Sequence, residues 1–234
     1  METKNLDVVY CIKNAPTNEE LRYSLRSLKN IPHSKVWIFG YAPEWIRSVE
    51  IVRQDQKGLN KWEKCGYSLK SICENEGVTE DFIWFNDDFF VMSEIEKLPY
   101  YIDRTLEERF RDFKRKSFYG TPSRYAYRLQ DAANALKTKG RTTVNYELHI
   151  PMIFNRKKLL KLWDIYPNIG AHRSLYGNEY SVGGEQRYDV KIYNNYSKPS
   201  LQADFISTTD KSFSIGEVGK YIKNKFNRKS IYEK

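Results

Sequence analysis

The chain has 234 residues, 40% of them hydrophobic, and carries a formal net charge of +9 at pH 7. Eighteen Tyr, twelve Phe and five Trp provide the material for a core, which excludes an intrinsically disordered protein. No apolar run approaches the roughly 18 residues of a membrane-spanning helix, so we expect no membrane span. The positive charge favours a polyanionic partner: nucleotide phosphates, nucleic acid or an anionic glycan.

The cysteines and the first residues bear on the compartment. Cys11, Cys65 and Cys73 are odd in number and lack metal-ligand spacing, so we expect free thiols. Met1-Glu2-Thr3-Lys4 does not open a signal peptide. Free thiols are typical of a reducing compartment, and we therefore expect a cytoplasmic protein.

The first 90 residues alternate between apolar runs and amphipathic stretches. Short apolar runs predict four buried strands, at residues 6–12, 36–40, 48–52 and 81–85. Thr17 or Asn18 can cap a helix with a leucine stripe between the first two strands, and residues 61–76 predict a second helix. This order indicates an α/β fold, a Rossmann-like and mostly parallel sheet flanked by helices.

The second half is less periodic, and we expect it to be rich in helices and loops. Helices are predicted near residues 104–116, 124–138 and 156–163, with loops between 164 and 200. We expect a single domain in which residues 1–100 bind the donor and residues 101–234 form the acceptor side. Basic residues gather in 104–128 and in the tail from Lys211.

The strongest local pattern is Asn86-Asp87-Asp88, which directly follows the apolar strand at 81–85. Placing two carboxylates beside a hydrophobic strand is costly unless a cation or hydrogen bonds compensate them. Asp88, Asp87 and the more distant His149 are therefore candidate ligands for Mn²⁺ or Mg²⁺, which prefer oxygen ligands and accept a diphosphate in their open positions. The alternative is an Asx turn or a helix N-cap that closes the strand.

The first half of the chain, with alternating strands and helices and a last strand that ends in two acidic residues, resembles the GT-A glycosyltransferases. The acidic motif of that family binds a metal and a nucleotide sugar. A narrower resemblance is to the Stealth family of sugar-1-phosphate transferases. It is carried by four segments: Asp7–Tyr10, Asn18–Leu28, Phe82–Phe90 and Glu147–Pro151. The Stealth family usually has an aromatic and acidic run after the first strand, where this chain has Ile12-Lys13-Asn14-Ala15. The choice between glycosyl and sugar-1-phosphate transfer therefore stays open.

The candidate donor-binding residues come from the first half of the chain. In α/β sheets ligands lie at the carboxyl ends of the strands, so a nucleotide-sugar donor would lie over the end of the first strand and the acidic turn. The predicted contacts are Tyr10, Ile12, Asn14, Arg22, Asn60, Lys61, Asn86 and Asp87. Arg22 could clamp a diphosphate, or could form surface pairs with Glu19 or Glu20 instead.

The candidate catalytic residues come from the second half. His149 could activate an acceptor hydroxyl or ligate the metal, and the alternative is a half-buried structural histidine. Glu147 shares a strand face with it by the two-residue period. Asp189 or Glu185 could be the base if His149 ligates the metal, and Arg173 could pair with a phosphate.

The sequence therefore predicts a metal-dependent transferase with a nucleotide-sugar donor and a glycan or other hydroxyl acceptor. Fingerprints of serine hydrolases, P-loop proteins and dinucleotide-binding proteins are missing. Two other functions stay open. One is a sugar transferase acting on modified nucleic-acid bases, with the basic segments binding phosphates. The other is a non-catalytic nucleotide- or carbohydrate-binding protein.

Overall fold

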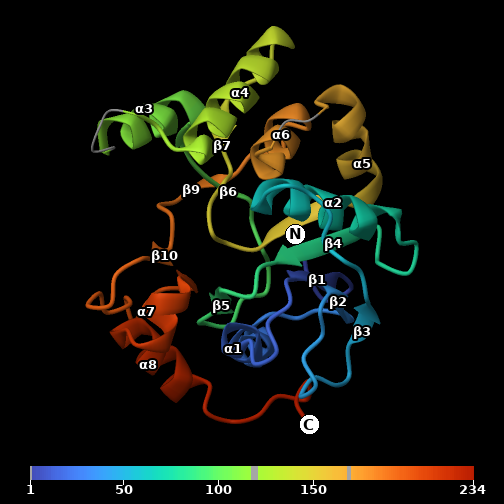
Figure 1. The fold of residues 1–234 in the computed structure, drawn as a ribbon, viewed down its shortest axis with the longest axis vertical. Coiled ribbons are helices and arrows are strands. Elements are labelled where there is room, and N and C mark those ends of the chain that lie inside the picture. Colours follow the sequence, from blue (N-terminus) through green and yellow to red (C-terminus); the bar gives the residue numbers. More distant parts are fainter. Residues whose placement is uncertain (1, 117–120, 168–169) are drawn as a thin grey trace.

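A five-stranded sheet with strand order β3-β2-β1-β4-β8 forms the centre of the protein (Figure 1). The computed structural model describes residues 2–116, 121–167 and 170–234. The strands of this sheet are β1 (Asp7–Ile12), β2 (Val36–Gly40), β3 (Glu50–Val52), β4 (Asp81–Phe85) and β8 (Met152–Asn155). The first four are parallel, and β8 joins β4 in the antiparallel direction. The predicted mostly parallel α/β sheet is confirmed.

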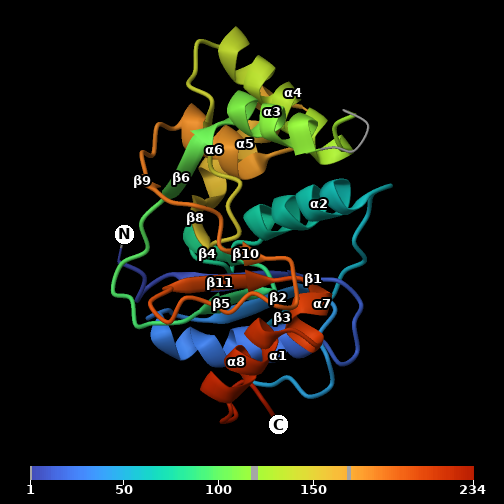
Figure 2. The same cartoon turned by 90° about the vertical axis from the view of Figure 1, so that its left-hand side faces the viewer.

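Helices cover both faces of this sheet (Figure 2). Helix α1 (Glu19–Ser27), continued by η1 (Leu28–Asn30), lies on one face, and α2 (Lys61–Glu74) lies on the other. Successive side chains of a strand point to opposite faces. Accordingly, Val8 and Tyr10 pack in the cluster that contains the α1 leucines, whereas Val9 packs in the cluster with Leu69 of α2.

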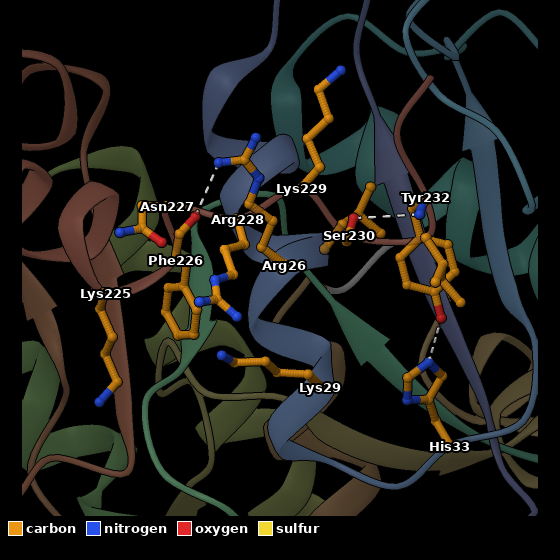
Figure 3. Close-up of a pocket in the computed structure, with 12 residues that line it drawn as sticks. Arg26, Lys29, His33, Lys225, Phe226, Asn227, Arg228, Lys229, Ser230 and Tyr232 are labelled. Atoms are coloured by element: carbon orange, nitrogen blue, oxygen red, sulfur yellow. Dashed lines mark hydrogen bonds between the residues drawn. The ribbon is translucent and has the colours of Figure 1, made fainter.

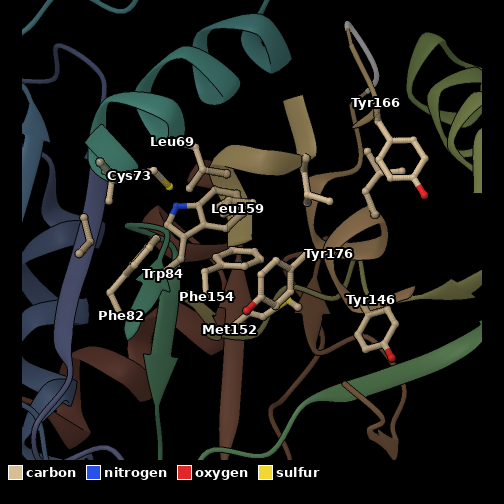
Figure 4. Close-up of a cluster of buried hydrophobic side chains, with 14 of the residues drawn as sticks. Leu69, Cys73, Phe82, Trp84, Tyr146, Met152, Phe154, Leu159, Tyr166 and Tyr176 are labelled. Atoms are coloured by element: carbon tan, nitrogen blue, oxygen red, sulfur yellow. The ribbon is translucent and has the colours of Figure 1, made fainter. Parts of the chain in front are cut away.

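An aromatic cluster fixes the end of β4 against the helices on the α2 side (Figure 4). The ring of Phe154 lies 6.1 Å from Phe82, 5.7 Å from Trp84 and 4.9 Å from Tyr176, measured between centroids. Rings at such separations in tilted or edge-to-face geometry stabilise a core beyond the area they bury. The residues that follow β4 therefore start from a rigid position.

The second half adds a three-stranded sheet and four helices to this side. The sheet has the order β7-β6-β9 and consists of β6 (Tyr101–Thr105), β7 (Val144–Asn145) and β9 (Glu185–Gln186). The helices are α3 (Leu106–Lys116), α4 (Arg124–Thr138), α5 (Arg156–Ile165) and α6 (His172–Glu179). The helices predicted near residues 104–116, 124–138 and 156–163 are confirmed, although residues 104–105 belong to β6. The prediction of loops between 164 and 200 was wrong where α6 lies.

A third sheet, with the order β10-β11-β5, lies beside the α1 side. It consists of β5 (Phe89–Val91), β10 (Lys191–Ile192) and β11 (Phe205–Thr208), and it is followed by α7 (Asp210–Ser214) and α8 (Glu217–Lys225). Both halves of the chain thus contribute to one sheet, since β11 pairs with β5. Cys11, Cys65 and Cys73 are unpaired, as expected. No helix within the described ranges is long and apolar enough to cross a membrane.

Candidate active site at the carboxyl edge of the sheet

The acidic residues occupy a tight turn at the end of β4. The carbonyl oxygen of Asn86 accepts a hydrogen bond from the amide of Phe89 at 3.2 Å, which reverses the chain and starts β5. Asp87 and Asp88 occupy the two middle positions of this turn, at the edge where β1, β2 and β3 also end. This backbone hydrogen bond defines a β-turn, which closes the strand and presents both carboxylates at the edge of the sheet.

Asn18 connects the start of α1 to this turn. Its Oδ1 accepts from the amide of Leu21 at 3.1 Å and caps the helix, while its Nδ2 donates to Oδ2 of Asp87 at 3.0 Å. Burial raises the pKa of Asp87, against the hydrogen bond from Asn18, which lowers it. The carboxylate is therefore held in place in an environment that disfavours its charge.

Asp88 is bound by side chains from the third sheet. Its Oδ2 accepts from Nζ of Lys191 at 2.7 Å and from Oγ of Ser207 at 3.2 Å. Its carbonyl oxygen accepts from the amide of Thr208 at 3.3 Å. Strands β10 and β11 thus hold Asp88 from the side opposite β4.

A third carboxylate, Glu20, faces the same turn. It accepts from Oγ1 of Thr208 at 2.7 Å. Burial is the main cause that raises the pKa of Glu20, to about 7, and Asp87, Asp88 and Asp210 raise it further. Glu20, Asp87 and Asp88 thus place three carboxylates around one turn.

These groups line a cavity of about 820 Å³, called the acidic cavity below. Its carboxylates are Glu19, Glu20, Asp87, Asp88 and Asp210, and its lysines are Lys13, Lys191 and Lys211. Within the described residues, no three His, Cys, Asp or Glu side chains are arranged to hold a metal ion. His149 therefore does not complete a three-ligand site with Asp87 and Asp88. The two carboxylates still fit Mg²⁺ or Mn²⁺, because such ions commonly bind one or two carboxylates and take their other ligands from substrate phosphates and water.

His149 forms a pair with Asp189. The carboxylate of Asp189 accepts from the backbone amide of His149 at 3.0 Å and contacts Nδ1 of its ring at 2.9 Å. Because a carboxylate only accepts, Nδ1 carries the proton and Nε2 keeps the basic lone pair. Although burial opposes it, the hydrogen bond from His149 lowers the pKa of Asp189, as does the nearby Arg109. Such a pair is suited to accept a proton from a hydroxyl.

A second cavity, of about 650 Å³, lies at the ends of β1, β2 and β3 and is called the strand-end cavity below. Of the predicted donor contacts, Ile12 and Asn14 line it, but Tyr10 does not: its side chain is fully buried and its hydroxyl is 2.9 Å from Oγ of Ser24. Arg53 and Lys64 also line this cavity and were not predicted. Lys13 lines both cavities and therefore connects them.

Three predicted donor contacts lie elsewhere. The guanidinium of Arg22 lies 4.7 Å from the ring of Trp45 and pairs with Glu19. It points from α1 towards the C-terminal segment, away from the acidic turn. Asn60 caps α2 with its side-chain oxygen and lines a separate cavity beside α4. The ammonium of Lys61 lies 4.9 Å from the ring of Trp62. The structure gives none of the three a contact with the acidic turn.

The structure gives two other predicted acceptor-side residues, Arg173 and Glu185, no contact with the side chains of the His149–Asp189 pair. Arg173 is 5% exposed, donates to the carbonyl of Ile150 and lies over the ring of Trp84 at 4.5 Å, so it is enclosed behind the turn. Glu185 is exposed in β9, at the edge of another sheet. Glu147 does not share a cleft with His149, because its carboxylate accepts from the buried amide of Ser174.

Sequence reasoning missed several residues of the site. Asn18 was recognised only as a helix cap, and Glu20 only as a possible surface partner of Arg22. Lys191 and Ser207 had no signal, because strands of two and four residues show too little periodicity to be recognised. Their role depends on a pairing between β5 and β11, more than a hundred residues apart in the chain.

A third cavity, of about 560 Å³, lies away from the acidic turn, between α1 and the C-terminal segment (Figure 3). Its lining is strongly basic and contains Arg26, Lys29, His33, Lys225, Arg228 and Lys229. Arg26 is already paired with Glu233 at 2.7 Å. No carboxylate lines this cavity, so it lacks the groups that a catalytic site of the predicted kind needs.

No family model and no curated protein matches the chain. Among solved structures, the apo form of the glycosyltransferase GlyE from Streptococcus pneumoniae TIGR4 is similar over 79% of this chain, with 12% identity and a TM-score of 0.36. A second GlyE structure covers 96% of this chain with 10% identity and a TM-score of 0.33. The chain spans about half the length of these structures, 45% and 50%. Similarity at this level carries no argument about function, and the Stealth resemblance stays a prediction from the sequence.

Proposed function

We propose that this protein is a transferase that uses a nucleotide-activated sugar as donor and a hydroxyl group as acceptor. One observation carries the proposal. Asp189 binds His149, and Lys191, two residues later in the chain, binds Asp88. One short segment therefore brings a candidate base close to the candidate metal-binding carboxylate. Both lie at the carboxyl edge of a parallel sheet, where α/β folds bind ligands.

The two adjoining cavities suit a donor of this kind. The nucleoside would lie in the strand-end cavity between Asn14 and Arg53, and the diphosphate would lie near Lys13, which lines both cavities. Asp87 and Asp88 would hold Mg²⁺ or Mn²⁺ together with the diphosphate. Such an ion, when bound, neutralises charge that develops on the leaving phosphate.

His149 is the proposed base on the acceptor side. Nε2 takes the proton of the acceptor hydroxyl while the acceptor oxygen forms its bond to the transferred group. Asp189 keeps the ring in the required tautomer and stabilises the imidazolium. If the glycosyl group moves, a nucleoside diphosphate leaves; if the sugar-1-phosphate moves, a nucleoside monophosphate leaves. Identifying the released nucleotide therefore distinguishes the two reactions.

The proposal is tested by separating donor binding from turnover in two variants. A panel of nucleotide sugars is screened by thermal shift, with Mn²⁺ and with EDTA. We expect Asp88→Asn to lose the Mn²⁺-dependent shift and to lower turnover by about 10²–10³-fold. Asp189→Asn should keep the donor-induced shift and lower turnover by about 10²-fold or more, because it changes only the base.

Asp164→Asn is the control, since Asp164 is exposed on α5 and far along the chain from both groups. It should behave like the wild type in both measurements. The proposal fails if no nucleotide sugar stabilises the wild type in either condition, or if Asp88→Asn turns over at the wild-type rate. A stabilised wild type without turnover on any hydroxyl acceptor would indicate a binding protein instead.

A further inference from the structure

The inference concerns Lys191, and it rests on the proposed metal site. The ammonium of Lys191 lies 2.7 Å from Oδ2 of Asp88, and the two side chains are only 15% and 14% exposed. Oγ of Ser207 donates to the same oxygen at 3.2 Å. A carboxylate oxygen has two lone pairs, so these two donors saturate Oδ2 of Asp88.

We propose that Lys191 acts as a built-in cation. In the metal-free protein its ammonium occupies the place beside Oδ2 of Asp88 that a divalent ion would take, and it leaves Oδ2 when such an ion binds. The acidic cavity contains Glu20, Asp87 and Asp210 besides Asp88. Glu20, Asp87 and Asp88 are partly buried. Without a metal these carboxylates repel one another, and a resident positive charge relieves the repulsion.

The attachment of Lys191 allows the ammonium to move while the backbone stays. Lys191 belongs to β10, whose pairing with β11 places it opposite Ser207. Oγ of Ser212 also donates to the carbonyl of Ile192 at 2.7 Å, which holds the end of this strand. A lysine ammonium sits on a flexible four-carbon stem, so it can leave Oδ2 by rotamer changes alone. Once released, it remains in a cavity that holds other carboxylates.

Competition of this kind has a measurable consequence for metal affinity. Lys191→Met removes the competing cation and keeps the apolar stem. We expect Mn²⁺, titrated without nucleotide and followed by electron paramagnetic resonance, to bind this variant about tenfold more tightly than the wild type, the factor expected for loss of an ion pair of about 1.4 kcal/mol. Lys191→Arg keeps a cation in place and should not tighten binding.

Thermal stability gives a second readout that does not depend on activity. In EDTA, Lys191→Met leaves Asp88 without its counter-ion, so we expect a lower Tm than for the wild type. Saturating Mn²⁺ should restore it, because the ion replaces the lost charge and ligand binding stabilises the folded state. The Mn²⁺-induced rise in Tm is then larger in the variant than in the wild type.

Two further variants make the result specific. Lys211→Met removes the same charge from the same cavity, but Lys211 has no contact with Asp88 within the described part of the chain. It should change Mn²⁺ affinity by less than about threefold, the effect of overall charge alone. In an Asp88→Asn background, the gain from Lys191→Met should disappear, as a direct coupling requires.

The inference is overturned if Lys191→Met, shown by circular dichroism to be folded, binds Mn²⁺ no more tightly than the wild type, or if Lys211→Met gains as much. This outcome differs from failure of the proposed function. That failure would appear in the wild type, as absence of stabilisation by nucleotide sugars in both Mn²⁺ and EDTA. Equal Mn²⁺ binding by both proteins with intact donor binding would reject only the role of Lys191.

Discussion

Ionisation of single carboxyl groups at the carboxyl edge of the central sheet is unfavourable in the metal-free protein. Glu20 illustrates it, because burial and the neighbouring carboxylates raise its pKa to about 7 from an ordinary value of 4.5. The hydrogen bond from Thr208 opposes this rise but does not cancel it. A site that disfavours negative charge when empty gains most from a bound cation.

This cost predicts a specific pH dependence. The pKa of Glu20 is higher in the folded than in the unfolded chain. Glu20 therefore does not lower the free energy of unfolding at pH values below the unfolded pKa. The loss of free energy grows as pH rises from about 4.5 to about 7. Glu20→Gln keeps an acceptor for Thr208 without the charge. In EDTA at pH 8 we expect it to raise the free energy of unfolding by about 1–3 kcal/mol, measured in urea.

At pH 4 the variant and the wild type should unfold at the same urea concentration, because both side chains are then neutral. Mn²⁺ at pH 8 should reduce the advantage of the variant, since the metal compensates the carboxylate. A constant difference between pH 4 and pH 8 would show that Glu20 does not titrate in the way its surroundings indicate.

At the level of elements, α6 is the part that most supports the acceptor side. Asn178, which is 2% exposed, donates to the carbonyls of Val144 and Ser174, each at 2.7 Å. Its Oδ1 accepts from the amide of Val144 at 2.9 Å and from Thr142 at 2.7 Å. A single side chain therefore joins α6 to β7, the strand that leads to His149.

Replacing this residue should destabilise the fold. Asn178→Ala leaves several buried donors and acceptors of β7 and α6 unsatisfied, and we expect a loss of about 2–4 kcal/mol in the free energy of unfolding. Urea denaturation at neutral pH measures it. Asn134→Ala, on the exposed side of α4, should leave the stability unchanged. Equal stability of the two variants would contradict the proposed connection.

The elements that sequence reasoning predicted well are those whose pattern is local. Residues 36–40, 81–85 and 124–138 form the predicted elements with the same bounds, because apolar runs and amphipathic periodicity are visible without tertiary information. Helix α6 was missed because it contains Gly177 and Asn178, weak helix formers, and begins after Ala171 in a left-handed conformation without a side-chain cap. Its stability comes from contacts with β7.

The residues of the candidate site also divide into those with a local sequence pattern and those without one. Asp87 and Asp88 were recognisable from the strand that precedes them, and Asp189 was named only as one of several possible bases. Its bond to His149, and the bond between Lys191 and Asp88, join residues 40 and 103 positions apart. No local pattern encodes such distances, and here the fold alone brings the partners together.

At the scale of the whole molecule, the C-terminal segment is fastened to α1. Both oxygens of Glu233 accept from the guanidinium of Arg26 at 2.7 Å, and the two side chains are 2% and 9% exposed. Ser230 also donates its amide to Glu233 at 2.9 Å. Arg26 also lines the basic cavity shown in Figure 3.

Breaking the pair should lower the stability of the whole domain. Glu233→Gln leaves the charge of Arg26 uncompensated in a buried position, and we expect a loss of about 2–4 kcal/mol, measured by urea denaturation. Glu217→Gln is the matched control, because its pair with Lys220 is exposed and should have no measurable effect. If both variants match the wild type, the C-terminal segment does not contribute to the stability of α1.

The distance along the chain between these two partners has a consequence for synthesis. Glu233 is added 207 residues after Arg26, which takes roughly 10–40 s at ~5–20 residues per second. Throughout that time the guanidinium of Arg26, in the last turn of α1, lacks the carboxylate partner that it has in the folded protein. Arg26 can therefore form this ion pair only after Glu233 has been synthesised and has left the ribosome.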